Sequence, residues 1–479
     1  MIKLPTPAVE DGSSAPRLAS FKVGPSQAGP TEMRCLIGVD DTDSHLGRCT
    51  THLGFQIVRA LANEGCLFRT YPRLVRLNPN IPFKTRGNAS VCIEFECEDP
   101  ERAFEIASSL TVRNADVENG ANSGLVFLDG PPAPIFRQLY HEAVSGLLNY
   151  RRVLKTLVQE RVRHSTLGNG MGVVGAAASI GFSPLDDHTY ELIAYRRSQM
   201  CGRPRVVDST SVKRMEMATF PHTFNSFDHL TERVLITPHG PDPVFFGIRA
   251  DSPGIALSAF RMIEYDERLA GHLIYLSNQC TDVHLASRLP VPVKAYYCGW
   301  AEGTVRAVAN GEGGHLYLDL DLGAGYSLRC AVYEPAHDLR RMAGAIAPGD
   351  RIRAFGGIRR SSSRHGPTLN VEKVEVLSVA PETRLVSPTC RSCGRRMKSE
   401  GAGKGFECRG CGAKSRARSK SIERSERRLV PGVYLPSPGS QRHLTKQLIR
   451  YGKELSTAHP LVDGWWGDAG YARPLPMRG

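Results

Sequence analysis

Four cysteines near the C-terminus constrain the fold of this chain more than any other feature. Cys390 and Cys393 form one CxxC pair, and Cys408 and Cys411 form a second after fourteen intervening residues. Two such pairs can place four thiolates tetrahedrally around one zinc ion and so close a small ribbon. Because the protein then fills all four positions, this zinc is structural. We expect a zinc ribbon over residues 385–415; free or redox-active cysteines are the alternative.

Positive charge is concentrated around these cysteines. The chain has 479 residues and a formal net charge of +13. Residues 391–428 contain 13 Lys and Arg, 4 Glu and no Asp, so this segment contributes +9 of that excess. Such a density favours contact with a phosphate backbone, and residues 416–479 are interpreted as a basic nucleic-acid-contacting segment. A solvated basic surface is the alternative.

The overall composition is that of a globular protein, with 41% hydrophobic and 23% charged residues. No apolar run is long enough to cross a bilayer, and the N-terminus lacks the hydrophobic core of a signal peptide. We therefore predict a cytoplasmic protein with no membrane partner. Residues 1–33 are rich in Pro, Ser, Gly and Ala and are predicted to be a disordered extension.

The pattern of strands and helices predicts a multidomain fold of α/β and α+β type. Residues 34–205 alternate buried strands with helices and are predicted to form an α/β domain. Residues 206–289 contain a strand, a turn and a helix that begins at Pro253, half of a ferredoxin-like domain. Residues 290–381 contain five short strands and suit an OB-fold barrel, with another small barrel or sandwich as the alternative.

A cluster of carboxylates follows the first predicted strand, in "LIGVDDTDSHLGRCTTHL". Asp40, Asp41 and Asp43 stand within four residues, where they repel one another unless a cation lies between them. Carboxylates at the end of a strand suit Mg²⁺, which leaves positions for water and substrate phosphates. A loop in which Asp caps the next helix is the alternative. A phosphatase pattern is excluded, since His45 stands where that pattern needs Thr or Val.

Cations follow in the irregular stretch "PRLVRLNPNIPFKTRG". Arg73, Arg76, Lys84 and Arg86 lie there among Pro and Asn residues. Cations beside a carboxylate–Mg²⁺ cluster are what triphosphate chemistry requires. The sequence has neither a Walker A motif nor a kinase glycine-rich loop, so any ATP site is unconventional.

A second basic stretch lies near the C-terminus, in "VYLPSPGSQRHLTKQLIRYGKE". Arg442, His443, Lys446 and Arg450 stand there at helical spacings. The spacing predicts either a phosphate-contacting helix or a solvated amphipathic helix.

Several of these stretches resemble one known family. "IGVDDTDS", "GRCTT", "YPRLVRLNPNIPFKTRGNAS", "GMGVVGAAASIGF", "TYELIAYR", "FFGIRADSP", "LSNQCTDVHL" and the two CxxC pairs occur in the order found in the archaeal tRNA-Ile2 2-agmatinylcytidine synthetases, the TiaS family. The resemblance runs from about residue 34 to 450. It implies a kinase-like domain, a ferredoxin-like domain, an OB fold and a zinc ribbon. The sequence departs from the family at His52 and Cys280, where Tyr and Gly are expected.

The resemblance also implies an ATP-dependent ligase. Such an enzyme phosphorylates the C2 oxygen of the wobble cytidine in the CAU anticodon of tRNA-Ile2, and agmatine then displaces the phosphate. ATP ends as AMP and two phosphates, and the product, 2-agmatinylcytidine, decodes AUA. Phosphorylation makes sense chemically because the cytosine C2 oxygen is otherwise a poor leaving group. The implied cofactors are ATP, Mg²⁺ and structural Zn²⁺, and the implied partners are tRNA-Ile2 and agmatine. No oligomeric state is predicted.

Site residues carry over by position. Asp40, Asp41 and Asp43 match the family's metal- and ATP-binding carboxylates, and Thr50 matches its autophosphorylated threonine. From their charge and their motif, and not from the family, we expect Lys84 and Arg86 to bind phosphate, with Arg73 and Arg76 beside them. Asp208 and Asp282 are predicted to bind agmatine, a dication, in an acidic pocket between the first two domains.

Two further interpretations remain open from the sequence. One is a non-catalytic RNA-binding protein in which the OB fold and zinc ribbon carry the function. The other is a related ATP-dependent tRNA modification with a different amine or RNA target.

Overall fold

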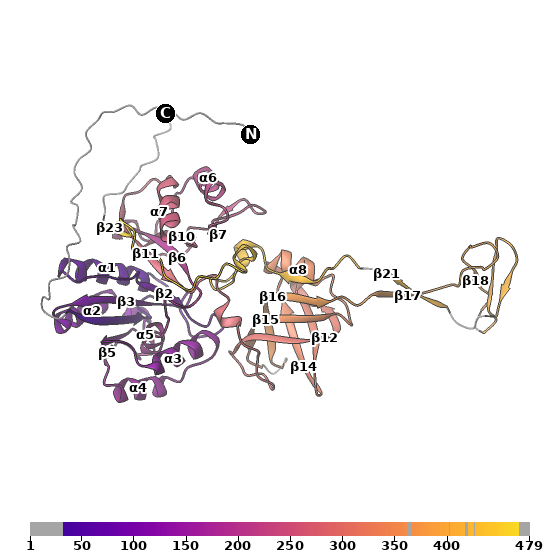
Figure 1. The fold of residues 1–479 in the computed structure, drawn as a ribbon, viewed down its shortest axis with the longest axis horizontal. Helices are drawn as coiled ribbons and strands as arrows, with labels where there is room; N and C mark the ends of the chain where they lie inside the picture. Colours follow the sequence, from indigo (N-terminus) through magenta and orange to yellow (C-terminus); the bar gives the residue numbers. More distant parts are fainter. Residues whose placement is uncertain (1–31, 362–365, 402, 417–419, 426, 469–479) are drawn as a thin grey trace, which may run out of the picture.

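A computed structural model describes residues 32–361, 366–401, 403–416, 420–425 and 427–468 (Figure 1). Apart from its last two residues, the extension predicted over residues 1–33 lies outside the described residues. So does the end of the predicted basic segment, from residue 469 onward. Within the described ranges, every helix falls short of the length and apolar character needed to span a membrane.

The first half of the main sheet is built around one buried strand. β1 (Met33–Asp40) lies between β3 (Ala89–Cys97) and β4 (Gly124–Asp129), antiparallel to both, with β2 (Arg73–Arg76) and β5 (Arg163–Thr166) outside them. The apolar run of β1 is buried because helices cover both faces of the sheet. These helices are α1 (Thr50–Asn63) and α2 (Pro100–Asn114) on one face, and α3 (Pro134–Ser145), α4 (Tyr150–Gln159) and α5 (Gly172–Ile180) on the other.

The second half of the sheet continues the first without a break. β11 (Leu269–Ser277) runs parallel to β2, with Leu276 opposite Arg73 and Ser277 opposite Leu74. Beyond it come β6 (Thr189–Arg196), β10 (Val244–Ala250) and β7 (Thr223–Phe224), covered by α6 (Ser209–Thr219) and α7 (Pro253–Met262). Together with β23 (Trp466–Asp468), which pairs with β11, the described strands of the two halves form one ten-stranded sheet.

The strand, turn and helix expected around Pro253 are confirmed. β10 is followed by Ser252, whose Oγ accepts from the Ile255 N–H at 3.3 Å and caps α7. The domain boundary at residue 205 stays a prediction. Strand pairing favours an earlier division, because β6 pairs with β10 and β11 rather than with the strands before it.

The predicted five-stranded barrel is confirmed. It consists of β12 (Cys298–Asn310), β13 (Leu316–Gly323), β14 (Tyr326–Val332), β15 (Arg351–Arg359) and β16 (Thr368–Ser378). A parallel pairing of β14 with β16 closes it around a hydrophobic core of its own, separate from that of the main sheet. A short helix, α8 (Asp338–Ala343), links β14 to β15, and β22 (Gly432–Tyr434) adds to β16.

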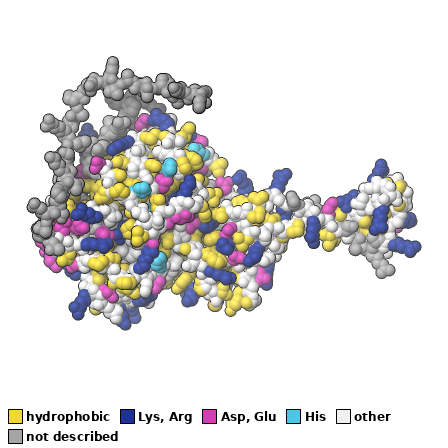
Figure 2. All heavy atoms as spheres, in the orientation of Figure 1, with side chains coloured by type: hydrophobic (Ala, Val, Ile, Leu, Met, Phe, Trp, Pro, Cys, Tyr) yellow, Lys and Arg dark blue, Asp and Glu magenta, His cyan; other side chains and the backbone are white. Residues whose placement is uncertain are grey.

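A two-stranded arm extends from the barrel. β17 (Glu382–Val386) pairs with β21 (Ser421–Ser425) and holds the cysteine-rich ribbon at its far end (Figure 1). That ribbon contains β18 (Lys398–Ser399), β19 (Phe406–Glu407) and β20 (Lys414–Ser415). Lys and Arg side chains are prominent on its surface (Figure 2). The chain then returns to the main sheet.

The helix suggested for the returning segment is wrong. Residues 441–447 are mostly extended and lie between two short 3₁₀ turns, Pro438–Ser440 and Leu448–Arg450. Its basic side chains are drawn inward: Lys446 and Arg450 are both buried and pair with Asp187, at 3.3 and 2.7 Å. The half-buried carboxylate of Asp187 therefore explains two of the basic residues that looked like one face of a helix.

Candidate active site

The carboxylates after β1 do not converge on one point. Asp41 takes a left-handed conformation, with φ of 54°, which turns the chain sharply at the end of the strand. Asp40 and Asp41 line one small cavity of about 80 Å³, here called the Asp41 cavity. Asp43 lines a second cavity of about 210 Å³, here called the Thr50 cavity. Thr85 and Asn88 line both, so the two cavities are neighbours.

Asp40 is held against a helix that approaches the strand closely. Its Oδ1 accepts from the Asp41 N–H at 2.8 Å. A Cβ on Gly175 of α5 would lie 1.7 Å from Asp40 Oδ2, so only glycine leaves room for this carboxylate. Burial, followed by the nearby Asp41 charge, raises the pKa of Asp40 well above its usual range.

Asp41 shares this unfavourable environment. Burial and the Asp43 charge raise its pKa to about 6. Among the described residues, neither Asp40 nor Asp41 has a Lys or Arg within ion-pair distance, whereas Asp43 lies 3.4 Å from Arg86. The Asp41 cavity therefore presents two adjacent carboxylates that have no Lys or Arg ion-pair partner among the described residues. Lys84 also lines it, together with apolar side chains that include Ile81, Phe83 and Met171.

The Thr50 cavity lies where the two halves of the main sheet meet. From the first half it is lined by Asp43, Thr50, Arg76 and Arg86, and from later segments by Glu191, Asp242, Arg249 and His443. Thr50 begins α1, and its Oγ1 lies 3.1 Å from the hydroxyl of Thr42. The cavity thus combines a hydroxyl with charges of both signs.

Arg86 holds the loop between β1 and α1. Its guanidinium donates to the carbonyl oxygens of Ser44, Gly47 and Arg48, at 2.9 to 3.0 Å. It also lies 3.4 Å from both Asp43 and Asp242. Most of its donors are therefore occupied within the protein, and its main structural effect is to shape the loop that carries Asp43.

A second group of basic side chains surrounds Glu191. Arg76 lies 4.0 Å and Arg249 3.5 Å from this buried carboxylate. Arg249 also donates to Nδ1 of His443 at 2.9 Å. The charge of Arg76, followed by burial, lowers the pKa of His443 well below its usual range, so this ring is neutral at pH 7.

The four cysteines of the arm fit a zinc ion. Their sulfur atoms all lie within 4.8 Å of one another. Cys393 and Cys408 Sγ are 3.3 Å apart, and Cys390 and Cys411 Sγ are 3.5 Å apart. Four thiolates at such separations suit tetrahedral zinc and leave no position for a substrate.

Comparisons with known proteins agree with this arrangement. Three family descriptions match the chain: the TiaS TCKD domain over residues 36–169, the TiaS FLD domain over 170–284 and the TiaS C-terminal zinc ribbon domain over 387–429. The tRNA(Ile2) 2-agmatinylcytidine synthetase TiaS of Cenarchaeum symbiosum (strain A) is 40% identical over 447 residues, which cover 91% of this chain and 96% of the relative. The chain belongs to the TiaS family.

Solved structures of TiaS proteins share the fold. A TiaS–tRNA(Ile2)–ATP complex is 32% identical, with a TM-score of 0.78 and coverage of 87% of this chain and 97% of that one. A TiaS–tRNA(Ile2)–AMPCPP–agmatine complex is 30% identical, with a TM-score of 0.76 and the same coverage. The resemblance predicted from the sequence is therefore confirmed, and the Thr50 cavity lies where the TCKD and FLD regions of this TiaS family chain meet.

One predicted phosphate ligand is misplaced. Arg73 is 3% exposed, lines neither cavity, and donates to Glu94 and to the Phe182 carbonyl, the latter at 3.1 Å. A guanidinium buried in this ion pair holds the sheet together rather than contacting a ligand. Arg76 and Arg86 line the Thr50 cavity and Lys84 the Asp41 cavity, and their phosphate roles stay predictions.

The two carboxylates predicted to bind agmatine, Asp208 and Asp282, already have partners within the protein. Asp208 caps α6 by accepting from the Ser211 N–H at 2.8 Å. Asp282 is buried, pairs with Lys373 and accepts from the Lys446 N–H at 2.8 Å. Neither lines the Asp41 or the Thr50 cavity, so the geometry argues against both as agmatine ligands.

Several cavity residues were missed from the sequence. Glu191 carried a usable signal, because a charged residue inside the otherwise apolar strand "TYELIAYR" needs a buried partner or a function. Asp242 and Arg249 carried none, since their places depend on how distant segments fold together. His443 was noted in the second basic stretch, but its place in this cavity was not predicted.

Proposed function

We propose that this chain is an ATP-dependent ligase that conjugates agmatine to C2 of the wobble cytidine in the CAU anticodon of tRNA-Ile2. The observation that carries the proposal is the similarity, over 87% of the chain, to the TiaS–tRNA(Ile2)–AMPCPP–agmatine complex. In the proposed reaction the C2 oxygen of cytidine takes a phosphoryl group, and the agmatine nitrogen attacks C2 as that phosphate leaves. ATP yields AMP and two phosphates: one leaves from C2, and the other is released as water cleaves a phosphoanhydride bond.

Mg²⁺ is proposed for the Asp41 cavity. Asp40 and Asp41 are adjacent and have no ion-pair partner among the described residues, so a divalent ion would relieve their mutual repulsion. One or two carboxylates are the usual protein contribution to Mg²⁺ that also binds substrate phosphates. When bound, the ion would neutralise charge on the triphosphate. Lys84 would contribute a further positive charge on the same side.

Thr50 is proposed as the phosphorylated threonine of the Thr50 cavity. It is 3% exposed, so its hydroxyl is shielded from bulk water. Because Thr50 begins α1, the positive end of the helix dipole lies at this residue and would favour added negative charge. Asp43, fixed beside Arg86, would orient the groups around it.

The barrel and arm are proposed to grip the tRNA body. The +9 charge between residues 391 and 428 lies on and around the arm, far from the two cavities (Figures 1 and 2). Residues 34–205 and 206–289 keep the kinase-like and ferredoxin-like labels as part of this proposal, as does a cytoplasmic location.

The test is mass spectrometry of nucleosides from a CAU-anticodon isoleucine tRNA transcript after incubation with protein, ATP, Mg²⁺ and agmatine. We expect a cytidine heavier by agmatine minus water. Asp41→Asn should abolish it, while Glu98→Gln, an exposed carboxylate change in the same half of the sheet, should not. Unmodified cytidine with ATP still consumed would indicate a different amine or RNA. If folded, zinc-loaded protein binds tRNA without turnover, the chain is an RNA-binding protein instead.

A further inference from the structure

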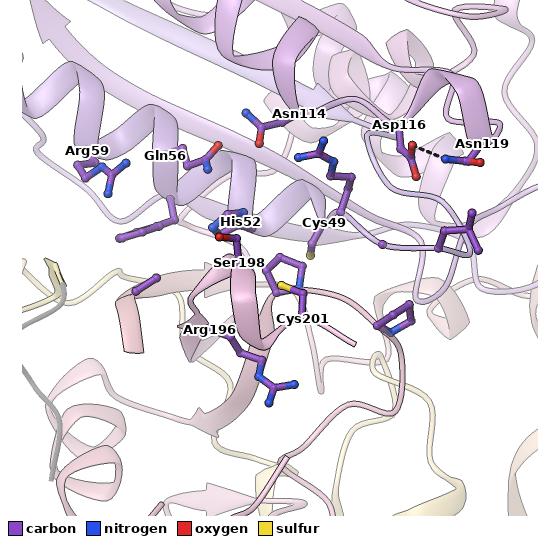
Figure 3. Close-up of a pocket in the computed structure, with 17 residues that line it drawn as sticks. Cys49, His52, Gln56, Arg59, Asn114, Asp116, Asn119, Arg196, Ser198 and Cys201 are labelled. Carbon is purple, nitrogen blue, oxygen red and sulfur yellow. Dashed lines mark hydrogen bonds between the residues drawn. The ribbon is translucent and has the colours of Figure 1, made fainter. Parts of the chain in front are cut away.

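A third cavity lies between α1 and the segment that follows β6. It has a volume of about 550 Å³, the largest of the three, and is here called the His52 cavity. One wall is α1, which contributes His52, Gln56 and Arg59; the facing wall is the segment after β6, with Ser198 and Cys201 (Figure 3). Neither the ATP and Mg²⁺ chemistry nor the phosphorylation of Thr50 uses this space.

Two arginines give the cavity a net positive charge. Arg48 is exposed at its rim, and the side chain of Arg59 is 43% exposed, with Asp468 3.5 Å away as a weak partner. Arg196 also lines the cavity, but its charge is matched by Glu267 in a buried ion pair at 2.7 Å. The one lining carboxylate, Asp116, already accepts from Ser44 and Asn119. An anionic ligand would therefore find two available cations.

The interior of the cavity suits a flat polar ring. The Gln56 Oε1 is buried and, within the part of the chain that the structure describes, has no hydrogen-bond partner. A buried acceptor without a partner is costly, so rotation of the Gln56 amide toward a donor in the cavity is favoured. The His52 ring packs 6.3 Å from Phe55 and 5.3 Å from Tyr195, between centroids. Burial, followed by the charges of Arg59 and Arg48, lowers the pKa of His52 to about 4, so the ring is neutral at pH 7.

The His52 cavity adjoins the Thr50 cavity. Cys49 lines both, and it directly precedes Thr50. The loop before Cys49, which Arg86 holds through three carbonyl oxygens, forms part of the rim of the His52 cavity. We place the reacting cytidine in the Thr50 cavity, beside the threonine proposed to be phosphorylated, so a nucleotide joined to it would lie close to the His52 cavity.

We propose that the His52 cavity binds one nucleotide adjacent to the wobble cytidine, with Arg48 and Arg59 contacting its phosphate and Gln56 accepting from its base. The inference rests on the proposed function, because it takes tRNA as the substrate. Its role is to hold the anticodon loop open around the reacting base, since unstacked bases of single-stranded loops are recognised by such pockets. The same chemistry could also recognise a free nucleotide, and the experiment separates the two sources.

The test is a binding cycle without ATP and agmatine. Affinities are measured for tRNA-Ile2 transcripts that are intact, or that lack the base on the 5′ or the 3′ side of the wobble cytidine. We expect one of these deletions to weaken binding to the wild-type protein about tenfold. The same deletion should change the affinity of Gln56→Ala or Arg59→Gln less than about twofold, because the contact is already lost. Arg113→Gln, an exposed arginine change on α2, is the control and should behave as wild type.

Two results would overturn the proposal. If both base deletions cost the variants as much as the wild type, the cavity holds neither neighbouring base. If nucleoside monophosphates bind the wild type, bind Arg59→Gln more weakly and do not compete with tRNA, the cavity serves a free nucleotide. Conjugation by the wild-type protein is measured separately, so either result leaves the proposed ligase activity standing.

Discussion

At the scale of single residues, the adjacent carboxylates Asp40 and Asp41 lower the stability of the ligand-free protein when both are ionised. Both are buried beside like charge, and both have raised pKa values. Such groups are retained for function rather than for stability. Function and folding should therefore respond in opposite directions when one of them is neutralised.

Asp41→Asn is predicted to stabilise the ligand-free protein at pH 8 while removing activity. The pKa of Asp41 is raised from 3.8 to about 6 on folding, so the folded state binds the extra proton. The stability of the wild type then falls as pH rises from about 4 to 6. The gain from Asn should be about 1 kcal/mol at pH 8, because partial exposure screens the charge, and should vanish near pH 4. Denaturant unfolding of both proteins at pH 4 and pH 8 measures the difference in free energy of unfolding. An equal difference at the two pH values would contradict the electrostatic cause.

Gly175→Ala is predicted to disable the same site through packing. The new Cβ would meet Asp40 Oδ2 at 1.7 Å and Ser90 Oγ at 2.6 Å, which forces the carboxylate to move. Turnover should fall on the order of 100-fold, the loss typical of one misplaced electrostatic group. Gly254→Ala in α7 is the control: its nearest atom is 3.9 Å away, so it should slightly stabilise the fold. Normal turnover by Gly175→Ala would show that the position of Asp40 is unimportant.

At the scale of elements, the second half of the sheet fixes the start of α1. The hydroxyls of Tyr195 on β6 and Tyr275 on β11 both donate to the Thr51 carbonyl, at 3.0 and 2.6 Å. The two hydroxyls also lie 3.0 Å from each other. This buried network joins the Thr50 region to strands more than a hundred residues later in the chain.

Tyr275→Phe is predicted to lower turnover about tenfold without changing the KM for ATP. Removal of the hydroxyl leaves the Thr51 carbonyl less restrained, so Thr50 is placed less accurately, at a cost in activation free energy of about 1.4 kcal/mol. Tyr333→Phe in the barrel loses a comparable hydroxyl contact, to Asn370 at 3.2 Å, and should retain turnover. Steady-state kinetics of the two variants test this prediction. Equal losses of turnover in both would indicate a general effect on stability and contradict it.

Prediction from the sequence succeeded where local pattern decides structure. The buried run of β1, the Ser252–Pro253 start of α7 and the paired cysteines each depend on neighbouring residues, and each was predicted. The returning segment was misread, because Lys446 and Arg450 have helical spacing but pair with Asp187, more than 250 residues away in the sequence. The linings of the cavities were predicted only in part for the same reason: Glu191 and His443 enter them through tertiary contacts.

At the scale of the whole molecule, the arm is predicted to depend on zinc while the sheet and barrel do not. Among the described residues of the arm, the hydrophobic core consists of Cys390, Met397, Phe406 and Cys408 with Ala413 packed against them, too little to fold without metal. Chelation, or Cys393→Ser, should unfold the arm alone, weaken tRNA binding and reduce its dependence on salt concentration. Calorimetry and salt titrations of tRNA affinity measure this. A lower unfolding temperature for the main sheet would contradict it.

The path of the chain has a consequence for its integrity. After the arm, residues 441–468 return to the main sheet, where the His443 carbonyl accepts from the Cys280 N–H and β23 pairs with β11. The barrel and arm are thus inserted between two segments of the chain that both pair within the main sheet. A protease that cuts within the arm should therefore leave two fragments that stay associated. The backbone can be cut in the arm without releasing β23, because β23 stays paired with β11.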